Sequence, residues 1–303
     1  MADPASGQPL LRPPLDPAGH PWQTAFCFVD VAQATYAIGE VAANINAAVI
    51  DCENQTTQSD RASCSAVLGN SVANLLYVFA YTASAVVQCA NTTVVPALDA
   101  SCTADVTGFL NGLATAWTVA SSLASGTCQN FTGVGPGRRL QADARRRDGR
   151  RQAPAAPPPR DYKHFLRDLQ SQPDLVAAAR AREADLAFCV FDVGQSVFYL
   201  TRAIVALHSS VQSCQPVKLE GSQGQVLCTV DVAGMLGAVF YTAQYASLIV
   251  DHCPAGENGL ALCAADIIGV LTVFTSLISS AAGWPASCGS LGKAAGRFEA
   301  EEQ

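Results

Sequence analysis

Charge is scarce in this chain, and positive charge is almost missing from the regions that carry cysteine. Only 14% of the 303 residues are charged, and twelve of the eighteen Lys and Arg lie between Arg138 and Arg182. The rest of the chain therefore lacks the cations that neutralise phosphates, so we expect no nucleic-acid partner. Familiar catalytic motifs are missing as well, since there is no P-loop, no HExxH and no G-x-S-x-G. We expect no enzymatic activity and no cofactor.

The N-terminal residues lack the apolar stretch of a secretory signal, because residues 1–22 are rich in Pro and Gly. Twelve cysteines, with an even number in each half, nevertheless indicate an oxidising compartment. We therefore expect that residue 1 is not the authentic start or that a leader is missing. The predicted location is secreted, lumenal or at the cell surface, with a membrane as the alternative.

The most regular feature of the chain is its set of cysteines, which form two groups of six. Gaps of 25 or 26 residues alternate with gaps of 10 to 14, and the second group follows the first at an offset of 160 to 164. Five of the six long segments open with C-x-x-D-[VI], and only the one at Cys64 departs from this form. Such an internal repeat predicts one structural unit used six times. The repeated carboxylates are Asp30, Asp105, Asp192, Asp231 and Asp266.

Each long segment between cysteines is predicted to be a helix of about 37 Å. Val31, Ile38 and Ile45 recur every seven residues, which is typical of the buried stripe of a helix. The matching residues of the second half are Val193, Leu200 and Leu207. The repeated Asp then lies in the first helical turn, where its charge complements the helix dipole, so we interpret it as structural. Pro285 is expected to end the last helix early.

The sequence predicts an all-α fold of two duplicated three-helix up-down-up bundles with cysteines at the helix ends. We expect a disordered segment at 1–23, the first module at 24–132, the second module at 173–290 and a tail at 291–303. Residues 133–172 are predicted to be a flexible linker rich in Arg and Pro, with a short helix in it. Its Arg runs are interpreted as solvated, and cleavage there is the alternative. Pro173 is predicted to start a helix that runs on through Cys189.

Short connectors predict antiparallel neighbours, so the cysteines gather at the two ends of each module. Because bonded cysteines need Cα atoms within about 7 Å, bridges between opposite ends are excluded. We predict bridges across the connectors, which are Cys52–Cys64, Cys89–Cys102, Cys214–Cys228 and Cys253–Cys263. The remaining cysteines are expected to join the two modules, as Cys27–Cys189 and Cys128–Cys288. A thiolate metal site at each end is the alternative, although no C-x-x-C occurs in the chain.

Three glycosylation sequons each follow a helix-closing cysteine by two residues, at Asn54, Asn91 and Asn130. If the helices crossed a bilayer, Asn54 and Asn91 would lie on opposite faces and could not both be glycosylated. Against this, residues 62–98 and 106–137 carry no charge and contain stretches long enough to span a membrane. We prefer a soluble or lumenal bundle and keep a polytopic membrane protein as the alternative.

The C-x-x-D-V opening, followed by an apolar helix and a closing Cys, resembles a group of uncharacterised cysteine-framed helical repeat proteins of dinoflagellates. The resemblance covers both modules and excludes the linker, and it implies no activity, cofactor or binding residue. We predict a non-enzymatic structural or interaction protein with an unknown protein or surface partner and with contact between its modules. A lipid or pigment carrier that binds between helices is a further alternative. The abundance of Ala, Gly and Ser is unfavourable to a carrier, because small side chains favour close helix approach over an open cavity.

Overall fold

The computed structural model describes residues 21–53, 55–89, 94–128, 173–216, 222–254 and 258–301. These residues form six helices and no strand, which confirms the predicted all-α class. The helices are α1 (Pro21–Asp51), α2 (Gln58–Cys89), α3 (Val94–Ala124), α6 (Pro173–Ser213), α7 (Ser222–His252) and α8 (Gly259–Glu301). Proline suits the first turn of a helix, because its missing N–H has no partner to lose there. α6 accordingly begins at Pro173, as the sequence predicted, and runs on through Cys189.

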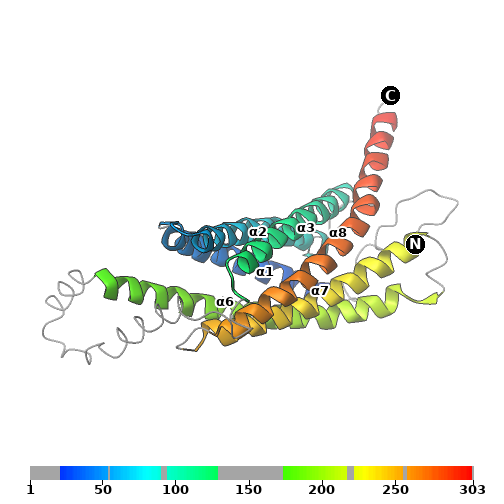
Figure 1. The fold of residues 1–303 in the computed structure, drawn as a ribbon. Helices are drawn as coiled ribbons and strands as arrows, with labels where there is room; N and C mark the ends of the chain where they lie inside the picture. The colour runs from blue at the N-terminus through cyan, green and yellow to red at the C-terminus, as the bar shows by residue number, and fades with distance from the viewer. Residues whose placement is uncertain are drawn as a thin grey trace, which may run out of the picture.

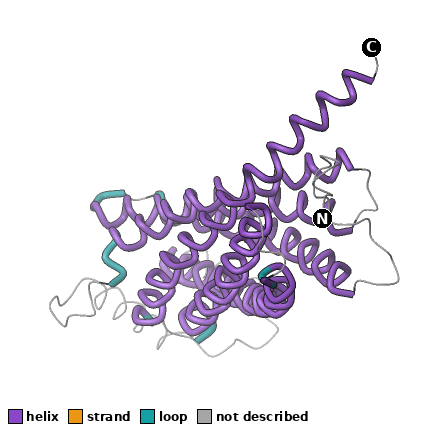
Figure 2. Tube along the Cα trace, turned by 90° about the vertical axis from the view of Figure 1, so that its right-hand side faces the viewer, coloured by secondary structure: helices purple, strands orange, loops and turns teal. Residues whose placement is uncertain are grey.

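The helices form a closed ring made of two rows (Figure 1). α1, α2 and α3 follow one another in the first row, and α6, α7 and α8 follow one another in the second. The ring closes where α3 packs on α8 and, over a smaller contact, where α1 packs on α6. Among the described helices α1 makes no comparable contact with α3, so each half is a row rather than the three-helix bundle expected from the sequence. The end of α8 projects beyond the ring (Figure 2).

Six disulfide bonds fasten three antiparallel helix pairs, each at both ends. The bonds between α1 and α2 are Cys27–Cys89 and Cys52–Cys64, and the equivalent bonds between α6 and α7 are Cys189–Cys253 and Cys214–Cys228. The bonds between α3 and α8, which connect the two halves, are Cys102–Cys288 and Cys128–Cys263. All bonded Cα atoms lie 4.9–5.0 Å apart. Each pair is thus held covalently at two levels, 25 or 26 residues apart along each helix.

This pairing corrects part of the predicted one. The predicted bridges Cys52–Cys64 and Cys214–Cys228 are present. The predictions Cys89–Cys102, Cys253–Cys263, Cys27–Cys189 and Cys128–Cys288 are wrong. One cysteine at each end of each half does bond to the other half, as expected, but both bonds join the third helices, whereas one of the two predicted bonds joined the first helices. The reason is geometric, since α3 and α8 run antiparallel and the start of each helix faces the end of the other.

The apolar stripe that was predicted to be buried lies on the outside of the ring. Val31, Ile38 and Ile45 are 50–59% exposed, and the matching residues of α6 are exposed as well. Apart from Val29, the buried positions of α1 are small or polar, and they are Asp30, Gln33, Ala37, Glu40 and Asn44. The prediction was wrong because periodicity shows which residues share a helix face and not which face is turned inward.

Glycines at the helix contacts explain why the helices pack through these faces. Gly194 of α6 lies directly under the ring of Tyr36 from α1. In the reciprocal contact, Gly39 of α1 lies under Phe191, where a Cβ would come within 2.6 Å of a ring carbon. Such close approach lets backbone and small side chains fill the interior at high density. The larger aliphatic side chains are then left on the outer faces.

The helices begin well before their cysteines, which changes the position of the repeated aspartates. α1 begins at Pro21, nine residues before Asp30, and α8 begins at Gly259, seven residues before Asp266. The predicted role at the helix dipole is therefore wrong. Pro285 does not end α8 either, because the helix continues through it to Glu301 and includes most of the expected tail. Pro285 is exposed, so the carbonyl that loses its N–H partner lies at the outer face.

Candidate functional site: a buried polar cluster between the two halves

Tyrosines fill the centre of the ring. Tyr77 of α2 and Tyr241 of α7 occupy equivalent positions, 164 residues apart, and their hydroxyl groups hydrogen-bond to each other. Tyr199 stacks on Tyr241 with ring centroids 4.4 Å apart, and its hydroxyl lies 2.7 Å from that of Tyr81. Tyr245 stacks on Tyr199 in turn. Burial raises the pKa of Tyr81 to about 12, so its hydroxyl stays neutral at physiological pH.

One side of this tyrosine cluster carries an ion pair between the two halves, in which Asp30 is buried and the side chain of Arg202 is 28% exposed. Arg202 of α6 donates to Asp30 of α1 at 2.8 Å and to Gln33 at 3.0 Å. The other carboxylate oxygen of Asp30 accepts a hydrogen bond from Ser84 of α2 at 2.5 Å, and Asp30 is only 1% exposed. The guanidinium also lies over the ring of Tyr81, 5.2 Å from its centroid. Burial alone would lower the pKa of Arg202, but the charge of Asp30 and the neighbouring tyrosines outweigh burial and raise it.

The opposite side of the cluster carries two acids at the equivalent positions. Glu40 of α1 stands where α6 has Arg202, and Asp192 of α6 stands where α1 has Asp30, each at an offset of 162 residues. Glu40 is 5% exposed and hydrogen-bonds to Gln195 of α6. Burial and the charge of Asp192 raise the pKa of Glu40 to about 8, although the hydrogen bond to Gln195 opposes the rise. Glu40 therefore holds a proton at pH 7.

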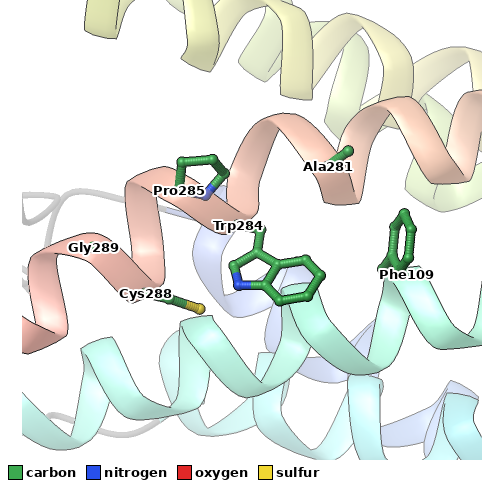
Figure 3. Close-up of a pocket in the computed structure, with 6 residues that line it drawn as sticks. All are labelled: Phe109, Ala281, Trp284, Pro285, Cys288 and Gly289. Atoms are coloured by element: carbon green, nitrogen blue, oxygen red, sulfur yellow. The ribbon is translucent and has the colours of Figure 1, made fainter.

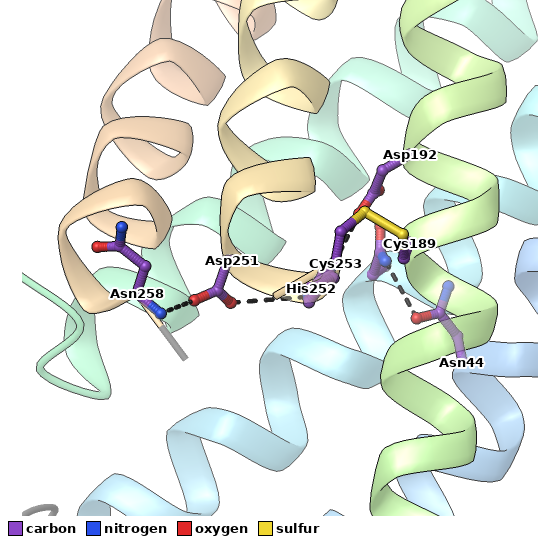
Figure 4. A network of polar contacts seen from close by, with 8 residues as sticks. Asn44, Cys189, Asp192, Asp251, His252, Cys253 and Asn258 are labelled. Carbon is purple, nitrogen blue, oxygen red and sulfur yellow. Dashed lines mark hydrogen bonds and ion pairs between the residues drawn. A yellow bond between two sulfur atoms is a disulfide. The ribbon is translucent and has the colours of Figure 1, made fainter. Parts of the chain in front are cut away.

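His252 of α7 connects this acid pair to the surface near the Cys189–Cys253 bridge (Figure 4). Its Nδ1 lies 2.6 Å from Asp192, and its Nε2 lies 3.8 Å from Asp251. Burial would lower the pKa of His252, but the hydrogen bond and charge of Asp192 outweigh burial and raise it. Burial raises the pKa of Asp192, while the bond from His252 opposes that rise. Because the His252 side chain is 23% exposed, it links the buried acids to solvent.

The other repeated aspartates also bind hydroxyl groups of neighbouring helices. Asp105 of α3 accepts a hydrogen bond from Ser287 of α8 at 2.6 Å. Asp266 of α8 accepts one from Ser122 of α3 at 2.7 Å, so the two contacts are reciprocal between the halves. Burial raises the pKa of Asp266 to about 6, although its bond with Ser122 opposes the rise. Asp231 accepts from Ser209 of α6 at 3.1 Å. The repeated Asp thus serves helix-to-helix contacts rather than helix starts.

Sequence reasoning missed the residues that complete this cluster. Glu40 and Arg202 were not singled out, although charged side chains are rare within the apolar segments between cysteines. That rarity was the available signal, because a lone charge in an apolar helix requires a buried partner. Gln33 and Gln195, which also sit at equivalent positions, carried no comparable signal.

A surface groove of about 630 Å³ lies between α3 and α8, apart from the polar cluster. Its lining residues are Phe109, Ala281, Trp284, Pro285, Cys288 and Gly289. The indole of Trp284 packs edge-on against Phe109 with ring centroids 5.8 Å apart (Figure 3). A second groove of about 400 Å³ lies between α1 and α2 near Cys52. Neither groove is lined by a titratable side chain, so neither groove combines with the polar cluster to form a reactive site.

The arrangement holds a proton on Glu40 and an ion pair between Asp30 and Arg202. The twelve cysteines are all bonded in pairs, so no thiolate is left for the alternative metal site. Within the described residues, no three His, Cys, Asp or Glu side chains are placed to hold a metal ion. The predicted glycosylation residues Asn54, Asn91 and Asn130 lie outside the described residues. No family model, no curated protein and no solved structure matches the chain.

Proposed function

We propose that this chain is a non-enzymatic structural or interaction protein of an oxidising compartment, which means a secreted, lumenal or cell-surface location. The observation that supports this proposal is that each of the three antiparallel helix pairs is bridged at both of its ends. Bridged cysteines of one helix lie 25 or 26 residues apart, which is about 37 Å along the axis. Both ends of the ring must therefore lie in an oxidising space.

The outer surface supports an interaction role. Between the bridged cysteines, no Asp, Glu, Lys or Arg side chain whose exposure is described is exposed, and all six helices present large apolar side chains to the outside. Contiguous apolar surface of this extent is uncommon on soluble monomers and marks an interaction site. The buried polar cluster serves this role by fixing the register of the two halves, because its ion pair and its tyrosine hydrogen bonds each join a residue of one half to a residue of the other.

A polytopic membrane protein is the second candidate. Four helices of the described part, α2, α6, α7 and α8, are long and apolar enough to cross a membrane. Small residues inside and aliphatic residues outside are also typical of membrane bundles. Disulfides at both ends weigh against this candidate, because one face of a cellular bilayer normally meets a reducing cytosol. A lipid or pigment carrier has less support, because the two grooves are open surface features and the centre of the ring is filled by tyrosines.

We also propose the resemblance to the dinoflagellate repeat proteins, which rests on the C-x-x-D-[VI] pattern alone.

Expression through a secretory pathway, followed by intact mass with and without reductant, tests the proposed location. We expect six bridges, glycans on the sequon residues, and release of the protein into the supernatant on alkaline carbonate extraction. Carbonate-resistant pelleting, together with free thiols at one end of the helices, would instead establish the membrane protein.

A further inference from the structure

α6 carries an unbroken outer stripe of eight large apolar residues. They are spaced alternately four and three residues apart and are 45–64% exposed, and they are Leu186, Val190, Val193, Val197, Leu200, Ile204, Leu207 and Val211. On the other described helices, runs of exposed large apolar residues at this spacing have at most four members, as on α2 and α8. The stripe therefore distinguishes α6 from the generally apolar outside of the ring.

The residue types in the stripe follow the rule for a two-stranded helix pair. Alternating steps of four and three place residues at the a and d positions of a heptad repeat. The a positions, Val190, Val197, Ile204 and Val211, are all β-branched, and three of the four d positions are Leu. β-Branched residues at a with Leu at d favour two parallel strands. The stripe thus has the composition of a seam that meets an identical helix.

The equivalent stripe on α1 lacks this property. At an offset of 162 residues, α1 has Thr24 in place of Leu186, Thr35 in place of Val197 and Ala42 in place of Ile204. The buried sides of the two helices are alike, since both place an Asp and a Gln inward toward the other half. The complete seam on α6 is therefore not required by the packing of the ring.

We propose that α6 docks against α6 of a second copy of this chain, in parallel and around a two-fold axis. Half-exposed side chains of this size each leave roughly 80 Å² to cover, so the stripes of two copies bury roughly 1,300 Å², which is enough for a specific interface. The positions that flank the stripe carry no Asp, Glu, Lys or Arg, so nothing there repels an identical helix. They also offer no charge pattern that would select a different partner.

This proposal rests on the proposed function, because it requires the outer surface to face an oxidising aqueous space. In a bilayer, lipid acyl chains would cover the stripe just as effectively as another helix. Pairing of two Leu and Val seams would then add little free energy of association. If a second copy of the chain covers the stripe, the protein should therefore behave differently in detergent-free buffer than if lipid covers it.

Charge substitutions at Leu200 test the pairing directly. Leu200 is a d position, and in a parallel pair it meets Leu200 of the second copy. By sedimentation equilibrium of the fully oxidised protein without detergent, we expect a wild-type dimer. Leu200→Glu and Leu200→Lys should each raise the dimer dissociation constant by at least about 100-fold, because like charges then face each other in the seam. An equimolar mixture of the two variants should form a dimer again.

Ile38→Glu supplies the matched control, because Ile38 is the equivalent residue of α1 and is similarly exposed. It should leave the dimer intact. The double variant V197T/I204A, which gives α6 the residues of α1, should weaken the dimer without added charge. A monomeric wild type, flotation of the protein with phosphatidylcholine vesicles, or equal effects of Ile38→Glu and Leu200→Glu would each overturn the proposal. Counting six bridges by mass in the same samples tests the proposed function separately.

Discussion

Glu40 and Arg202 occupy the same position in the two halves of the molecule, yet they give the two sides of the α1–α6 contact opposite electrostatics. Arg202 forms an ion pair with Asp30 at 2.8 Å, whereas Glu40 faces the field of Asp192 and is held neutral. One side of the contact is thus stabilised by attraction, and the other depends on a bound proton. The contact between α1 and α6 is also the smallest in the ring, and no disulfide spans it.

The first prediction concerns the pH dependence of stability. The folded state raises the pKa of Glu40 from 4.5 to about 8, so between these values the folded state binds a proton that the unfolded state has released. Glu40 should therefore contribute a fall in stability of about 1.4 kcal/mol for each pH unit across this window, in addition to the smaller falls from Asp266 and His252, whose pKa values are also raised. Glu40→Gln should make the fall shallower by this contribution and add roughly 2–4 kcal/mol at pH 8.5. Urea unfolding of the oxidised wild type and variant between pH 5 and 9 measures this pH dependence of the free energy of unfolding.

Glu53→Gln is the control for the loss of one negative charge, because Glu53 is exposed beyond the end of α1. Its stability curve should stay parallel to that of the wild type. If Glu40→Gln also left the slope unchanged, the buried proton would have been assigned to the wrong group.

The second prediction concerns the ion pair. Arg202→Met should leave the carboxylate of Asp30 buried without its cation and destabilise the fold by about 3–5 kcal/mol. The double variant D30N/R202M removes both charges and should recover more than half of that loss, because the cost comes from an unpaired charge. Chemical unfolding at pH 7 of the two single variants and the double variant gives the coupling. Additive effects would mean that the pair contributes no coupling.

The third prediction concerns close approach between α1 and α6. Gly194→Ala should destabilise the fold by about 1–3 kcal/mol, because the new Cβ would overlap the ring of Tyr36. Gly289→Ala on α8 is the matched control, since a Cβ there meets nothing within 4 Å. It should stabilise the fold by about 0.5–1 kcal/mol through the helix propensity of alanine. Thermal unfolding of both variants decides it, and a neutral Gly194→Ala would contradict the packing described for this contact.

The fourth prediction concerns the bonds between the halves. Cutting the chain at a protease site inserted between residues 129 and 172 should leave two fragments held together by Cys102–Cys288 and Cys128–Cys263. Non-reducing electrophoresis should show one species, and reductant should release two. After replacement of these four cysteines by serine, both fragments should migrate separately without reductant. Separation of wild-type fragments without reductant would favour bridges confined to each half.

Much of the fold could be predicted from the cysteines, because their spacing shows how many helices there are and at which end of the ring each sulfur lies. The helix lengths could not, since the helices run for 31–43 residues and extend beyond the 25-residue segments between cysteines. The identity of the bonded pairs could not be predicted. Cys27 and Cys102 lie at the same end of the first half, and only the packing of α3 on α8 decides which of them bonds to Cys89. The inward face was also missed. Val31 and Asp30 are neighbours in sequence, and the burial of Asp30 depends on Arg202, which lies in the other half.

The bonds between α3 and α8 make the peptide connection between the two halves redundant once oxidation is complete. We therefore expect the order in which the halves are translated not to change the bonded pairs. A circularly permuted gene, in which residue 303 is joined to residue 1 and the chain runs from residue 173 to residue 128, is expected to give the same six disulfides. Two separate genes would do so too, provided that both products met in one oxidising compartment.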